Sequence, residues 1–266
     1  MSKRGSSEDK TVVKPTFIKE MRIVKKLGEG GTGRTLLLQD EAIGQLFAVK
    51  KYAPLDEGRR DELYDRFVDE IKILFLIYHP NIVRIFDYYL YPKYKSGYIQ
   101  MEYIEGNTID KINPVDYDKE WNDYFVDAIN AFQYLHSKNI MHRDIRPQNF
   151  MVNNEGSLKI IDFGFGKHTE NSKTINSVLL NWPASKPPEE IVNDRNYNKS
   201  TEIYFLGNLF KHLIDDNSTF LYCDILDKMN EQSVLLRYNS FDEIIEDISK
   251  ITIYNSDFSE KEKKDI

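Results

Sequence analysis

The sequence of 266 residues contains a single cysteine, Cys223. One thiol cannot form an intramolecular disulfide, so the composition favours a reducing compartment and we expect a cytoplasmic protein. Positive charge is also not in excess, because 36 Lys and Arg residues stand against 43 Asp and Glu residues, for a net charge of −7. A nucleic-acid-binding protein would normally be basic, and we therefore expect no nucleic-acid partner.

Long apolar runs are missing as well. The longest run of note, residues 73–78, is far too short to span a bilayer, so we expect no membrane partner. Residues 1–10 are polar and lack the apolar core of a secretory signal. The His and Cys residues form no tight cluster, which argues against a zinc site. The remaining composition is ordinary for a globular protein, and the length allows one large domain or two lobes that share a cleft.

The strongest chemical signal is the run His142-Arg143-Asp144-Ile145-Arg146-Pro147-Gln148-Asn149. Two short apolar segments follow it, residues 150–152 and 158–161, with a turn between them and Asp162-Phe163-Gly164 after them. This pattern predicts a β-hairpin, whose outer ends lie close together. Asn149 and Asp162 should therefore meet, with Asp144 just before them. Oxygen ligands in that arrangement suit Mg²⁺, or Mn²⁺, bound together with substrate phosphates.

A glycine-rich segment, residues 28–33, lies between two predicted strands at residues 17–27 and 35–38. A hairpin tip with so few side chains allows its backbone N–H groups to approach phosphates closely. A dinucleotide-binding fingerprint would need a helix after the glycines, whereas a strand follows here.

A third predicted strand, residues 46–52, places Lys50 on a largely apolar face. A buried ammonium needs a partner, because burial alone disfavours its charged form. Glu70 provides a candidate, since it shares the inward apolar face of a predicted helix over residues 61–76. The alternative for Lys50 is a surface side chain whose ammonium reaches solvent.

The order of these motifs resembles the catalytic core of the eukaryotic-type protein kinases. The resemblance covers roughly residues 17–252. It implies an α+β, two-lobed, protein-kinase-like fold, with a small antiparallel β-sheet N-lobe and one key helix in residues 17–104. A mainly helical C-lobe would occupy residues 105–252. We expect residues 1–16 to form a disordered tail and residues 253–266 a charged tail.

The resemblance implies a role for each residue of the central motif. Asp144 would be the base that orients an attacking hydroxyl and accepts its proton. Arg146 would place positive charge on the γ-phosphate of ATP. Asn149 and Asp162 would hold the metal ions.

The nucleotide site follows from the same resemblance. Lys50 and Glu70 would form the ion pair that aligns the α- and β-phosphates of ATP. Met101 would lie at the back of the adenine pocket, and Thr108 or Asp110 would reach the ribose. The remaining expected ATP-binding residues are Gly28, Glu29, Gly30, Gly31, Thr32, Gly33, Thr35, Ala48, Met151 and, through their main chains, Glu102 and Ile104.

The polar segment after Gly164 resembles an activation loop. Its candidate phosphosites are Thr169, Ser172, Thr174 and Ser177. Kinases with an Arg at the position of Arg143 are often switched by a phosphate in this loop, and an unmodified, solvated loop is the alternative. Residues 187–189 resemble the end of the loop, and Arg237 is the expected buried partner of Glu189.

Three features depart from the family pattern. Residues 181–186 lack the Thr that serine/threonine kinases use to position the catalytic Asp, which leaves the class of acceptor hydroxyl open. Glu202 stands where the family has Asp. The segment from Gly207 to Arg237 is short, so a surface that docks substrates and partners in the family looks trimmed.

We expect an ATP-dependent protein kinase that acts on a protein hydroxyl, in the serine/threonine class, with autophosphorylation in the activation loop. Tyrosine or dual specificity stays open. A nucleotide-binding pseudokinase module is the first alternative, although every group that must be charged is present. A small-molecule kinase on the same fold is the second, and Pro147 and the shortened C-lobe are compatible with it.

Overall fold

The computed structural model describes residues 20–30, 33–53, 58, 60–162, 167–168, 187–194, 196–214 and 219–257. The expected tail at residues 1–16 lies outside this part of the chain, as do residues 258–266 of the expected C-terminal tail. Within the described part, no helix is long and apolar enough to cross a membrane.

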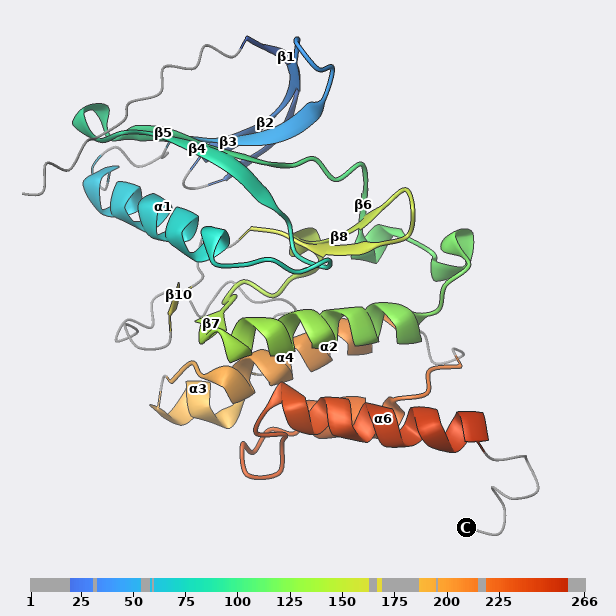
Figure 1. Cartoon of the computed structure of the whole chain (residues 1–266). Coiled ribbons are helices and arrows are strands. Elements are labelled where there is room, and N and C mark those ends of the chain that lie inside the picture. The colour runs from blue at the N-terminus through green and yellow to red at the C-terminus, as the bar shows by residue number, and fades with distance from the viewer. Residues whose placement is uncertain are drawn as a thin grey trace, which may run out of the picture.

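The N-terminal half is an antiparallel sheet with a helix against one face (Figure 1). The strand order is β1-β2-β3-β5-β4, and each neighbouring pair is antiparallel. The bounds of these elements are β1 (Met21–Gly30), β2 (Gly33–Asp40), β3 (Leu46–Tyr52), α1 (Arg60–Phe75), β4 (Ile85–Tyr91), η2 (Pro92–Tyr94) and β5 (Ser96–Glu102).

Helix α1 packs on the sheet through the stripe that its sequence predicts. Leu63, Phe67 and Ile71 recur at helical spacing and are buried, together with Tyr52 of β3 and Ile99 of β5. This small core fixes α1 beneath β3.

The C-terminal half is mainly helical (Figure 1). Its helices are η3 (Ile109–Lys111), η4 (Pro114–Tyr117), α2 (Trp121–Ser137), η5 (Pro147–Asn149), α3 (Glu189–Asp194), α4 (Lys199–Leu213), α5 (Cys223–Met229) and α6 (Phe241–Asp257). Its short strands are β6 (Gly106–Thr108), β7 (Ile140–Met141), β8 (Phe150–Asn153), β9 (Leu158–Ile160) and β10 (Lys167–His168). Helix α6 runs five residues past the expected lobe boundary at residue 252, to Asp257.

Helix α2 is the centre of the larger core. Phe125, Ile129 and Phe132 form an apolar stripe at helical spacing, and each is fully buried. The ring of Phe132 stacks on Phe150 of β8, with 6.2 Å between centroids, and contacts His142 at 6.1 Å. The helix therefore holds both the central motif and the strand that follows it.

The predicted hairpin is confirmed. Strands β8 and β9 pair antiparallel, with Phe150 opposite Ile160, and Gly156 adopts a positive φ of 76° in the turn. The N–H of Ile161 donates to the carbonyl oxygen of Asn149 at 2.9 Å, just beyond the last paired residues. This bond closes the outer end of the hairpin and brings Asn149 next to the residue before Asp162.

The expected partner of Arg237 is wrong by one residue. The guanidinium pairs with Glu190 at 2.7 Å, and both side chains are buried, whereas Glu189 is exposed. Both glutamates lie in the first turn of α3, where successive residues point about 100° apart, so only one of them can face inward. Arg237 also donates to the carbonyl oxygens of Ser200 and Gln232, which ties α3 and α4 to the segment before α6.

This pair yields a stability prediction with a matched control. Glu190→Ala leaves the buried guanidinium without its carboxylate, and we expect a loss of roughly 3–5 kcal/mol in the free energy of unfolding. Glu189→Ala, at the adjacent exposed position, should change it by less than about 0.5 kcal/mol. Urea denaturation of the three proteins measures both values. Equal losses for the two variants would contradict the assignment of Glu190 as the partner.

Candidate active site

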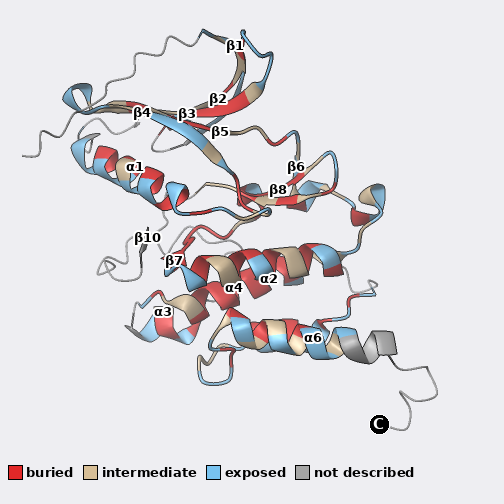
Figure 2. Cartoon of the chain, in the orientation of Figure 1, coloured by how far each residue is buried: buried red, intermediate tan, exposed pale blue. Residues whose placement is uncertain are grey.

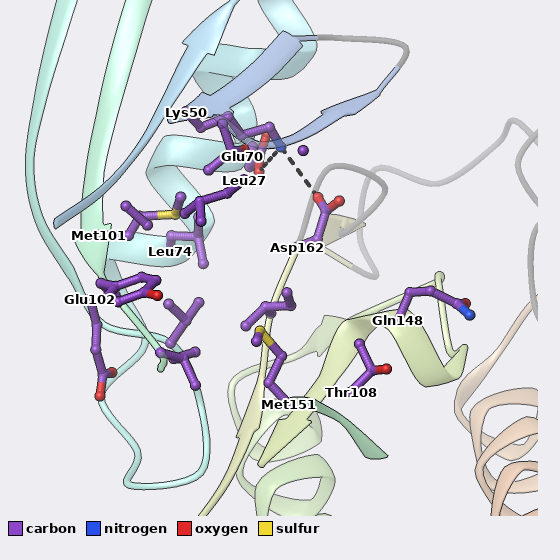
Figure 3. Close-up of a pocket in the computed structure, with 17 residues that line it drawn as sticks. Leu27, Lys50, Glu70, Leu74, Met101, Glu102, Thr108, Gln148, Met151 and Asp162 are labelled. Carbon is purple, nitrogen blue, oxygen red and sulfur yellow. Dashed lines mark hydrogen bonds and ion pairs between the residues drawn. The ribbon is translucent and has the colours of Figure 1, made fainter. Parts of the chain in front are cut away.

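A cavity of 350 Å³ lies between the sheet and the helical half (Figure 3). This volume is within the range of small-molecule sites, and the lining is mainly apolar with a few charged groups. Of the expected ATP-binding residues, those that line the cavity are Gly28, Thr35, Ala48, Lys50, Met101, Glu102, Ile104 and Met151. Glu29, Gly30 and Gly33 lie next to the β1–β2 turn and are not among the lining residues, and Gly31 and Thr32 are outside the described part of the chain.

Sequence reasoning missed several residues of the cavity. Leu27, Gln148 and Ile161 line it, and each is adjacent to an expected site residue, which is the signal that could have identified them. Val83 and Leu74 also line it. Of the two residues considered for the ribose, Thr108 lines the cavity and Asp110 is exposed.

Strand register determines which side chains reach the cavity. In β3, Ala48 is opposite Met101 of β5, and Lys50 is opposite Thr35 of β2. These residues share one face of the sheet because alternate residues of a strand point the same way. At the start of β2, a Cβ on Gly33 would lie 2.2 Å from the carbonyl oxygen of Lys51, so only glycine allows the two strands to pair this closely.

The ammonium of Lys50 connects three elements. Its Nζ lies 2.7 Å from Oε1 of Glu70 in α1 and 3.2 Å from Oδ1 of Asp162, just after β9 (Figure 3). The predicted Lys50–Glu70 pair is therefore present, and a surface position for Lys50 is excluded because its side chain is 12% exposed. Burial alone would lower the pKa of Lys50, but the carboxylates of Asp162 and Glu70 outweigh that effect and raise it. Lys50 is consequently a fixed positive charge in the cavity.

The carboxylate of Asp144 is held by its neighbours in the central motif. Asn149 Nδ2 donates to the carbonyl oxygen of Asp144 at 2.8 Å and to its Oδ2 at 2.9 Å, and Arg146 Nη2 lies 3.2 Å from Oδ2. Within the described part of the chain, Oδ1 is buried and has no hydrogen-bond partner. A buried carboxylate oxygen without a donor is costly, so Oδ1 can accept a hydrogen bond from a bound ligand.

Burial raises the pKa of Asp144, while His142, Arg146 and Asn149 act in the opposite direction. His142 itself is fully buried, with Nε2 3.1 Å from the carbonyl oxygen of Ile161 and Nδ1 3.3 Å from the N–H of Asp144. These contacts give His142 a packing role and link the motif to the end of the hairpin.

The oxygen atoms near the Asp144 carboxylate suit a hard divalent cation. Nδ2 of Asn149 points to Asp144, which turns the amide oxygen to the opposite side. The carboxylate of Asp162 is 39% exposed at the edge of the cavity. Among the described residues there is no cluster of three or more His, Cys, Asp or Glu that could bind a metal alone. A cation here would therefore take its other ligands from phosphates and water, which is the habit of Mg²⁺.

Comparison with known proteins agrees with this geometry. A profile of the protein kinase domain family matches residues 21–263. The chain belongs to the protein kinase family.

Several proteins resemble this kinase domain. A probable serine/threonine-protein kinase of Dictyostelium discoideum is 29% identical over 77% of the chain and 30% of its own length. The probable serine/threonine protein kinase IRE of Arabidopsis thaliana is 33% identical over 57% of the chain and 13% of its length. Human cyclin-dependent kinase-like 2 is 28% identical over 69% of the chain and 37% of its length. The chain thus spans only a minor part of each of these relatives.

Residues 142–149, the central motif, are called the catalytic loop of this kinase domain below. Glu202, from α4, holds this loop in place. Helix α4 begins where the Asn198 side chain accepts from the N–H of Thr201 at 3.1 Å, which places Glu202 in the first turn. Glu202 is fully buried and accepts from the N–H of Arg143 at 2.7 Å and from the hydroxyl of Tyr197 at 3.1 Å. Its other oxygen lies 2.8 Å from Nε2 of His136. The longer side chain of Glu therefore still reaches the loop, and His136 has a structural role.

Residues 101–106, which lead from the end of β5 to the start of β6, are called the hinge below. Glu102, in the hinge, has its side chain outside the cavity. Its carboxylate pairs with Lys159 at 2.8 Å, and its N–H donates to the carbonyl oxygen of Arg84 at 2.9 Å. In Figure 3 its side chain points away from the other lining residues. Any contact of Glu102 with a nucleotide would therefore come from the remaining main chain.

Several sequence-based assignments lie outside the described residues. They are Phe163 and Gly164, the candidate phosphosites Thr169, Ser172, Thr174 and Ser177, and residues 181–186.

The hydrogen bonds of Glu202 yield a prediction of how the stability of the protein depends on pH. Burial alone would raise the pKa of Glu202, but hydrogen bonds from His136 and the Arg143 N–H dominate and lower it below its ordinary value of 4.5. A lowered pKa contributes stability above pH 4.5, and that stability is lost as the pH falls through the pKa of the folded state. Glu202→Gln should therefore cost about 2 kcal/mol at pH 7, with a smaller difference from the wild type below pH 4.5.

Denaturation of both proteins across pH 3–8 would measure this difference, with Glu189→Gln as an exposed control for the loss of one carboxylate. A difference that stays constant with pH would show that Glu202 contributes by packing rather than by charge.

Proposed function

We propose that this kinase domain transfers the γ-phosphoryl group of ATP to a Ser or Thr hydroxyl of a protein substrate. The observation that carries the proposal is the position of the Lys50 ammonium, which contacts Glu70 and Asp162 at one edge of the cavity. Gln148 also lines this cavity, and it belongs to the central motif that contains Asp144 and Asn149. Phosphoryl transfer depends mainly on positioning and charge stabilisation, and this site supplies charged groups already fixed by neighbours.

Each residue has a definite task in this proposal. Lys50, held by Glu70, would bind the α- and β-phosphates. Asp144 would accept a hydrogen bond from the substrate hydroxyl at Oδ1 and take its proton during transfer. Arg146, on the other carboxylate oxygen of Asp144, would place positive charge toward the γ-phosphate.

Asn149 and Asp162 would hold Mg²⁺ or Mn²⁺, which, when bound, neutralises phosphate charge. The adenine would lie on the apolar walls between Ala48 and Met151, with Met101 behind it and the main chain of Ile104 at its edge.

The acceptor class rests on the relatives. Two of them are named as probable serine/threonine kinases. The retained charges weigh against a pseudokinase module, and membership of the protein kinase family weighs against a small-molecule kinase. We further propose autophosphorylation within Thr169–Ser177 and, from the single cysteine, a cytoplasmic location.

Incubation of the purified chain with labelled ATP and Mg²⁺, followed by mass spectrometry, tests the proposal. We expect phosphate on Ser or Thr, and at least ~100-fold less in Asp162→Asn and in Asp144→Asn. Asp224→Asn, which removes an exposed carboxylate in α5, is the matched control and should transfer phosphate normally. Phosphate on Tyr would reassign the acceptor class. Magnesium-dependent ATP binding with no transfer to protein would overturn the proposal in favour of the two alternatives.

Arg146 allows a test of Asp144 as the base. Its guanidinium lowers the pKa of the Asp144 carboxyl, against the effect of burial. Only the ionised carboxylate can accept a proton, so activity falls as the pH drops through this pKa. In Arg146→Gln the acid limb of kcat/KM should therefore move to higher pH, whereas Arg146→Lys should leave it near the wild-type position. An unchanged limb in Arg146→Gln would assign the titration to another group.

A further inference from the structure

A second cavity, of 320 Å³, lies on the rear of the hinge. The 350 Å³ cavity, in which we place ATP, is called the nucleotide cavity below. Val83 and Glu102 line both this cavity and the rear cavity, so the two cavities share a wall at the hinge. The lining of the rear cavity includes the apolar residues Ile77, Pro80 and Ile82 and the positively charged residues Arg84 and Lys159. The proposed kinase reaction uses none of these side chains except in the shared wall.

The charges of the rear cavity do not balance. Lys159 is neutralised by Glu102 at 2.8 Å. The guanidinium of Arg84 instead lies 5.3 Å from the ring of Tyr78 and 5.4 Å from the ring of Phe86. Among the residues that the structure describes, no carboxylate forms an ion pair with it. In a chain of net charge −7, the rear cavity thus offers one uncompensated cation beside an apolar wall. A ligand that fits has a carboxylate next to an apolar group.

The surface around the rear cavity carries exposed aromatic side chains. Phe86 is 46% exposed and Tyr78 is 74% exposed. Phe75 and Tyr88 pack edge to face and are 49% and 44% exposed. Figure 2 shows the exposed character of β4, which carries Phe86 and Tyr88. Contiguous exposed aromatic surface is typical of a protein-binding site.

A third hollow, on the other side of Phe86, is lined by Phe47, Asp87 and Gln100. Gln100 is only 2% exposed, and within the described part of the chain its Oε1 has no hydrogen-bond partner. A buried acceptor without a donor is costly, and a peptide backbone can provide an N–H. Two hollows on either side of one aromatic ring suit an extended chain that crosses it.

We propose that this rear surface, comprising Tyr78, Arg84, Phe86 and Gln100 with their two hollows, docks a segment of a partner protein. The segment would place an aromatic or aliphatic side chain against Ile77 and Val83 and an adjacent Asp or Glu on Arg84. Its main chain would donate to Gln100. The partner is thus recognised by an acidic–apolar motif, at a site separate from the nucleotide cavity.

Fluorescence anisotropy with short labelled peptides, in which Phe or Leu is flanked by Asp or Glu, tests the proposal without nucleotide. Failure of the proposed kinase activity would therefore not affect the result. We expect saturable binding to the wild-type chain and at least ~10-fold weaker binding to Arg84→Gln, because a charge-assisted hydrogen bond is lost. Arg84→Lys should restore most of the affinity. Lys93→Gln, at the far end of the β4–β5 connection, is the matched control and should bind as the wild type does.

Tyr78→Ala provides a second variant, since its exposed ring can be removed without opening the core, and it should also weaken binding. Peptides with Lys in place of the acidic residues should not bind. Equal affinity for acidic and basic peptides, no binding of any acidic peptide, or unchanged affinity in both Arg84→Gln and Tyr78→Ala would overturn the proposal.

The wall shared by the two cavities predicts coupling between peptide binding and nucleotide binding. If docking shifts Val83 or Glu102, saturating ATP analogue should change the peptide Kd, and the peptide should change the nucleotide Kd by the same factor. An unchanged Kd in both directions would overturn this coupling, while the peptide measurements above decide the docking itself.

Discussion

A buried ammonium organises the N-terminal half of this kinase domain. Lys50 lies in the middle of a strand, within a largely apolar region, and its charge is tolerated only because carboxylates from two other elements reach it. One of them belongs to α1 and the other to the end of the β8–β9 hairpin, so the ion pairs relate the sheet, the helix and the hairpin to one another. The shape of the nucleotide cavity depends on this arrangement, because all three elements line it.

Buried charges also determine the arrangement of the helical half. Apolar packing buries its helices, and the buried charges determine how these helices are placed relative to one another. Phe125 and Phe132 of α2 fill the core, but many arrangements of helices could bury such rings. Glu202 and the Glu190–Arg237 pair are more selective, since each needs several donors at once. Removing any donor would leave a buried charge unsatisfied, so α3, α4 and the catalytic loop are held in one relation.

Exposed apolar side chains lie in both halves of the chain. In the segment between α4 and α6, Leu235 is 89% exposed. Exposed aromatic residues instead gather around the rear of the hinge, where Arg84 lacks a carboxylate partner among the described residues. Because that surface shares a wall with the nucleotide cavity, partner recognition and nucleotide binding are physically close.

The sequence by itself determined the local elements and the chemistry of the site. Alternation in β3, the apolar stripes of α1 and α2, and the hairpin after Asn149 are short-range patterns, and each could be read without knowledge of the rest of the chain. The pairing of Lys50 with Glu70 was also predictable, because both are charges on apolar faces and each requires a partner.

Only the tertiary structure decided features that depend on contacts between distant segments. The choice of Glu190 over Glu189 for Arg237 depends on the rotation of one short helix, which composition does not specify. The place of Val83 and Gln148 in the cavity, and the gathering of Arg84, Phe86 and Gln100 on one surface, arise from how strands and loops pack. Local sequence encodes which groups need partners, whereas three-dimensional packing selects the partners that they find.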